Sequence, residues 1–232
     1  MKKLIITTII LLSISYVFSQ ESERNNASFS LGDGISFSFN EGDYEFNIYG
    51  FIKPTYIYND EKIYTADGEY SNVFRQFKSQ NSNLFFTGFA KDEKLSFTIQ
   101  MDYSSSNPLV EAFIGYHFNE NTTLYFGQMQ VNHNNLEMTH NEDRLRFTNR
   151  GILSQTYTEN GEEFGLFFET SFGKSIIFKP TLAITSGDGK NSFGDDSRDS
   201  DKGGVKFGSR INIFPFGDFS MGNRLSTVDL MH

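Results

Sequence analysis

The stretch that decides the fold is Leu95-Ser96-Phe97-Thr98-Ile99-Gln100-Met101-Asp102-Tyr103, in which apolar and polar residues alternate without an error. A period of two places the apolar side chains on one face of a strand and the polar side chains on the other. The same alternation recurs in Tyr44–Tyr58, Phe164–Phe172, Ile176–Ile184 and Val205–Ile213. No helical period competes with it over any long window. The chain is therefore predicted to be all-β.

The lengths of the connections between these strands differ in a regular way. Short turns are expected at 91–94, 119–121 and 172–174, whereas the connections 59–71, 132–160 and 186–203 are long and polar. Short turns at one end, long loops at the other and strands of about nine to eleven residues are typical of transmembrane barrels. Aromatic residues stand at strand ends, as in an interfacial girdle: Tyr56, Tyr58, Tyr103, Phe118, Phe214 and Phe216. We expect an antiparallel up-and-down transmembrane β-barrel, with a soluble sandwich or lipocalin-like barrel as the alternative.

The composition of the 232 residues excludes several classes of protein. The chain has no Cys, which excludes a disulfide scaffold, thiolate zinc sites and a Cys nucleophile. Its net charge is −9, so no basic stripe exists for a nucleic-acid partner. No nucleic acid is expected among its partners.

The first nineteen residues have the pattern of a secretory signal peptide. Lys2 and Lys3 precede an apolar run from Leu4 to Leu12, and Val17-Phe18-Ser19 fits a cleavage site. We expect residues 1–19 to be removed and residues 20–232 to form the barrel domain. Export by this route, together with the strands, predicts the outer membrane of a Gram-negative bacterium.

Several landmarks follow one another along the chain. The aromatic strand Asp43–Lys53 precedes a strand with a late glycine (Leu84 to Gly88), then Met101-Asp102-Tyr103 and the acid–alanine pair Glu111-Ala112. The strand Leu124–Val131 contains Gly127-Gln128 and leads into a long loop with Leu136-Glu137 and Arg150, after which comes Phe164-Gly165-Leu166. In this order, from about Ser28 to Phe219, the landmarks resemble the phosphate-selective porin O and P family.

The resemblance implies a homotrimer of 16-stranded outer-membrane barrels. It also implies a long loop folded inward, with cationic side chains that select anions, phosphate in particular. Three positions depart from the family pattern: Gln80-Asn81 stands in place of an arginine pair, and Phe51 in place of an arginine. These departures favour passage of small hydrophilic solutes in general over selectivity for phosphate.

About eight long strands and a short N-terminal one are expected, which is about half of such a barrel. The chain also ends in Asp229-Leu230-Met231-His232, without the terminal aromatic residue of outer-membrane barrels. The N-terminal part of a larger porin is expected, so that residues 20–232 are C-terminally incomplete. A divergent small barrel is the alternative.

The residues expected to line the pore are the charged members of the polar alternation phase. They are Glu45, Lys53, Asp102, Glu111, His117, Glu169, Lys179, Lys206 and Arg210. Arg144, Arg146 and Arg150 form the densest basic cluster, in the long loop, and Arg75 lies near the second long strand. Arginine and lysine would contact anions through charge-assisted hydrogen bonds. The alternatives are a solvated outer face for the strand residues and surface pairing of the loop arginines with Glu142 and Asp143.

Nothing in the sequence predicts catalysis, a metal site or a cofactor. The carboxylates of residues 187–203 lack the spacing of an EF-hand, so a solvated loop is expected there rather than a Ca²⁺ site. The expected function is that of a porin, not an enzyme, with outer-membrane lipid and small anions or solutes as partners. The alternatives are a secreted soluble β-domain that binds carbohydrate or another small ligand, and an adhesive surface barrel without a pore.

Overall fold

A computed structural model describes residues 25–90, 93–133, 151–157, 161–187, 189 and 204–216, so the predicted signal peptide lies outside the described residues. The described part is all-β, as predicted, apart from a 3-10 turn at Asn40–Gly42 and the short helix α2 (Ile152–Tyr157). Its strands are β1 (Asn26–Ser30), β2 (Gly34–Phe39), β3 (Tyr44–Gly50), β4 (Pro54–Thr65), β5 (Gly68–Ser79), β6 (Asn83–Ala90), β7 (Leu95–Asp102), β8 (Leu109–Asn119), β9 (Thr122–Gln130), β10 (Glu162–Thr170), β11 (Ile177–Thr185) and β12 (Lys206–Phe214).

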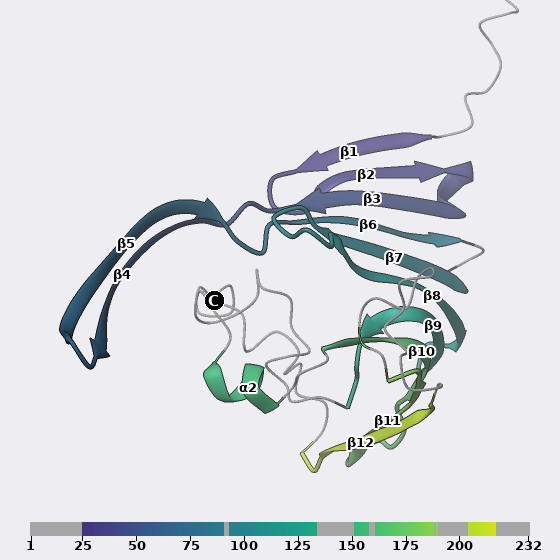
Figure 1. Ribbon diagram of the computed structural model, residues 1–232. Helices are drawn as coiled ribbons and strands as arrows, with labels where there is room; N and C mark the ends of the chain where they lie inside the picture. The colour runs from purple at the N-terminus through teal and green to yellow at the C-terminus, as the bar shows by residue number, and fades with distance from the viewer. Residues whose placement is uncertain are drawn as a thin grey trace, which may run out of the picture.

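Ten of these strands form one curled antiparallel sheet (Figure 1). Their order is β1-β2-β3-β6-β7-β8-β9-β10-β11-β12, so that each strand lies beside its predecessor in the sheet. The predicted turn at 119–121 is confirmed, since it joins β8 to β9. The topology is that of a meander.

The sheet is not closed into a barrel. Strands β1 and β12 each pair on one side only, with β2 and β11 respectively, and not with each other. Closure requires the two edge strands to exchange backbone hydrogen bonds, and the described residues contain no such pairing. The prediction of an up-and-down antiparallel arrangement is confirmed, while the closed form is not observed in this part of the chain.

The segment between β3 and β6 differs from the prediction. A single strand was expected over Tyr44–Tyr58 and a polar loop over 59–71, but β3 ends at Gly50 and β4 pairs with β5 along its whole length. The turn at Ala66 and Asp67 is followed by Gly68, whose φ of +134° an L side chain rarely adopts. This hairpin forms a sheet of its own that projects away from the larger one (Figure 1).

The two faces of the ten-stranded sheet have opposite chemistry. The register places Phe97, Ile114, Phe126, Leu166, Leu182 and Ile211, with their alternating neighbours, on one side, which we call the apolar face. The other side, the polar face, carries Asn47, Thr87, Gln100, His117, Glu169 and Arg210, with their alternating neighbours. Across the ten described strands the only charged residue on the apolar face is Glu162, at the start of β10.

Burial on the two faces is the inverse of that in a water-soluble protein. On the apolar face, Ile114 is 57% exposed and Ile211 is 63% exposed. On the polar face, Gln100 is 3% exposed and Glu163 is fully buried. Within the described residues the buried apolar side chains are only Phe85, Val131, Phe167 and Ala183. The greater burial of the polar face places it on the inside of the curl.

Candidate functional site

Charged and hydroxyl side chains from three adjacent strands gather on the polar face of β10, β11 and β12. Residues two apart on a strand share a face, so β10 contributes Glu163 and Glu169, and β12 contributes Lys206 and Arg210. Thr185 of β11 is the register partner of Lys206, and Thr181 is the partner of Arg210. We call these six residues, together with His133, the β10–β12 cluster.

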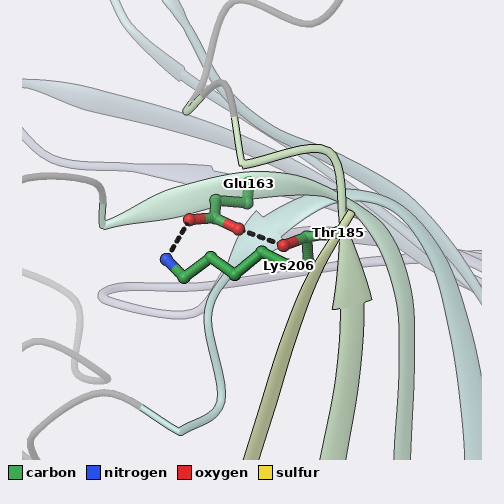
Figure 2. Close-up of polar contacts among 3 residues, drawn as sticks. All are labelled: Glu163, Thr185 and Lys206. Carbon is green, nitrogen blue, oxygen red and sulfur yellow. Dashed lines mark hydrogen bonds and ion pairs between the residues drawn. The ribbon is translucent and has the colours of Figure 1, made fainter. Parts of the chain in front are cut away.

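Glu163 lies at the centre of one half of the cluster (Figure 2). The ammonium group of Lys206 donates to Oε1 of Glu163 over 2.5 Å, and the hydroxyl group of Thr185 donates to Oε2. The carboxylate is fully buried, while the side chain of Lys206 is 46% exposed. A buried carboxylate is tolerated when both of its oxygens accept hydrogen bonds and a cation offsets its charge. Lys206 and Thr185 provide both conditions.

Glu169 and Arg210 form the second half. Both lie opposite Thr181 in register, one on each side of it, and their charges attract each other. The side-chain amide of Asn132 also donates to Oε1 of Glu169 over 3.3 Å. The two cations of β12 therefore each face a carboxylate of β10 across the intervening strand.

The chain that follows β9 lies against this cluster. Val131 is fully buried and Asn132 is 6% exposed. The ring of His133 lies over Gly208 so closely that a Cβ at Gly208 would be 1.9 Å from the ring. Burial lowers the pKa of His133 below its ordinary value, and nearby Lys206 lowers it further while Glu163 opposes the change. The first residues of the predicted inward-folding loop thus contact the polar face.

The other predicted cations that the structure describes do not join the cluster. Lys179 lies on the polar face with its ammonium group 5.3 Å from the ring centroid of Phe214. Arg75 is on the projecting hairpin, where its guanidinium group lies 5.4 Å from the ring centroid of Tyr58. Lys53 lies between β3 and β4, and its backbone N–H donates to the hydroxyl group of Ser82. Of the five predicted anion contacts among the described residues, only Lys206 and Arg210 lie in the cluster.

Some predictions fall outside the described residues. Arg144, Arg146 and Arg150 do so, as do most of the residues of the acidic segment 187–203. Among the residues that the structure describes, no group of three or more His, Asp or Glu side chains is placed to hold a metal ion. No helix in the described ranges is long and apolar enough to cross a membrane.

Sequence reasoning missed Glu163, Thr185 and His133. The sequence does contain a signal for Glu163, because this residue shares the alternation phase of Glu169. It was missed because the predicted strand began one residue later, at Phe164. Thr185 was missed for a similar reason, because the predicted strand ended at Ile184. His133 carries no local signal, because its position depends on how the chain turns after β9.

Comparison with known proteins adds no family assignment. No protein-family model matches the chain, and no curated protein is significantly similar to it.

Proposed function

We propose that this protein is an outer-membrane porin, and that its ten-stranded sheet is part of the wall of a β-barrel through which small hydrophilic solutes diffuse. The observation that carries the proposal is the inversion of the two faces, with large apolar side chains exposed and polar side chains buried. On this proposal strands outside the ten-stranded sheet complete the barrel. The protein is exported by its signal peptide, and its assembly is a homotrimer, as its resemblance to the phosphate-selective porin O and P family implies.

The apolar face supports contact with lipid. The largest apolar patch on a typical soluble monomer is about 300–600 Å², whereas here the exposed apolar residues extend from Phe29 in β1 to Ile213 in β12. Leaving such a surface in water costs about 25 cal/mol per Å². Contact with hydrocarbon removes that cost. The described part of the apolar face has one charged residue, which lies at a strand end, where the cost of placing a charge in lipid is small.

The polar face supports a water-filled interior. Several of its hydroxyl, amide and charged groups bond to one another, as in the pair of Gln100 and Asn83, in which Nε2 of Gln100 donates to Oδ1 of Asn83 over 3.1 Å. The strands of the sheet centre, β6 to β11, have 8 to 11 residues, near the length that crosses a bilayer at a tilt.

Two neighbouring residues of β7 provide a matched test. Ile99 is on the apolar face and Thr98 is on the polar face, so Ile99→Arg places a charge in lipid and Thr98→Arg places it in the lumen. We expect Ile99→Arg to weaken folding into phosphocholine vesicles by about 2–4 kcal/mol, and Thr98→Arg to weaken it much less. The fraction folded is measured by heat-modifiable gel mobility, and wild-type vesicles are then assayed for conductance in planar bilayers.

Each other outcome supports a different function. A chain that stays monomeric without detergent, and that tolerates Ile99→Arg, would be a secreted soluble β-domain that binds carbohydrate or another small ligand. Insertion that depends on Ile99 but gives no conductance would indicate a surface barrel without a pore.

A further inference from the structure

We propose that the lumen favours neutral polar solutes and small cations over phosphate and other anions, and that Glu163 and Glu169 are the specificity-determining residues. This inference rests on the proposed porin function and names the class of solute.

The first step concerns the ion pair that Lys206 forms. An ammonium group attracts anions when its charge is not already balanced, yet the Nζ atom of Lys206 is 2.5 Å from Oε1 of Glu163. The carboxylate cannot move into water, because it is fully buried and Thr185 donates to its second oxygen. An approaching anion would therefore meet an ion pair rather than a free cation.

The second step concerns Arg210. This guanidinium group faces Glu169 across Thr181, and the side-chain amide of Asn132 donates to the same carboxylate. A column of two cations on β12 is thus matched by a column of two carboxylates on β10. Paired opposite charges reduce the field that each alone would project into the lumen.

The third step is the rest of the polar face. Across the ten described strands its carboxylates outnumber its cations: Glu45, Asp102, Glu111, Glu163 and Glu169 against Lys179, Lys206 and Arg210. A hollow of about 220 Å³ near β1, β2, β3 and β6 is lined by Ser, Asn, Thr, Phe, Gly and Glu45, with no lysine or arginine. Rings of carboxylates favour cations, and hydroxyl or amide linings suit neutral polar solutes.

The test uses the full chain in planar bilayers under a KCl gradient, with the reversal potential giving the permeability ratio of K⁺ to Cl⁻. We expect wild type to be weakly cation-selective and inorganic phosphate to leave its current unchanged. The double variant Glu163→Gln/Glu169→Gln should lower the ratio several-fold toward Cl⁻. Glu61→Gln, on the projecting hairpin, is the control and should leave the ratio unchanged.

Substitution of the cation gives a second readout of opposite sign. Glu163→Gln removes the carboxylate that pairs with Lys206, so Lys206→Gln is measured as well and is expected to raise the ratio, with the folding of every variant checked by heat-modifiable gel mobility. Wild-type selectivity for Cl⁻, or block of the current by phosphate that Lys206→Gln removes, would overturn the inference and leave the porin function intact. Absence of any conductance from wild type would overturn the porin function, and this inference with it.

Discussion

At the scale of single residues, the function of a cation depends on a neighbour that is distant in sequence. Lys206 was expected to contact anions because it lies on the polar phase of its strand. Its partner Glu163 is 43 residues earlier and comes from a strand two positions away in the sheet. Alternation identifies the face of a residue, but the sheet order decides which charges share that face.

Gly208 tests the contact between the chain after β9 and the sheet. Because the ring of His133 occupies the space of a Cβ, Gly208→Ala should force the ring or the strand to move, at a cost of about 1–3 kcal/mol. The urea midpoint of the folded, detergent-solubilised chain measures the change.

The matched control is Gly204→Ala, because an added Cβ there meets nothing within 4 Å. We expect its midpoint to equal that of wild type. Equal midpoints for both alanine variants would show that His133 does not rest on Gly208.

At the scale of elements, the β4–β5 hairpin is a structure that the alternation of apolar and polar residues did not predict. Its cross-strand contacts include Lys62 with Glu69 at 2.7 Å and the rings of Tyr56 and Phe77 at 4.7 Å. Polar and charged residues occupy both alternation phases between 59 and 71, so no apolar face marked the segment as a strand. Backbone pairing and these contacts form the hairpin without a buried face.

Because this hairpin pairs with no strand of the larger sheet, we expect that it can be removed. Replacing residues 56–77 with an Asn-Gly turn should change the free energy of unfolding by less than about 1 kcal/mol, because loop-closure entropy depends weakly on length. Circular dichroism and the urea midpoint in detergent test this. A large loss of sheet signal would mean that the hairpin is required for the pairing of β3 with β6.

At the scale of the whole molecule, the sheet has two open edges, and a membrane-spanning form would need both of them paired. Among the described residues, no strand pairs with the outer side of β1 or of β12. In hydrocarbon each unpaired group costs several kcal/mol, so a membrane form needs both edges paired. In the proposed porin, strands outside the ten-stranded sheet pair with these two edges.

A cysteine-free chain makes the edges simple to test by crosslinking. In the detergent-folded chain, Ser28→Cys/Asn212→Cys should give no intrachain disulfide on oxidation, because β1 and β12 do not pair. Ser28→Cys/Ser36→Cys is the positive control, since these residues are directly opposite in register. Formation of the first disulfide, read from gel mobility, would indicate that the ten strands close on themselves.

The sequence by itself determined the all-β class, most strands of the large sheet and the face of nearly every residue on them. It could do so because a strand repeats every two residues, so one face is a local property of the chain. Only the tertiary structure decided that Glu163 neutralises Lys206, that Glu169 faces Arg210, that His133 lies on Gly208 and that β4 and β5 leave the sheet. These depend on which strands become neighbours and where the chain turns, and such long-range contacts leave no periodic trace in the sequence.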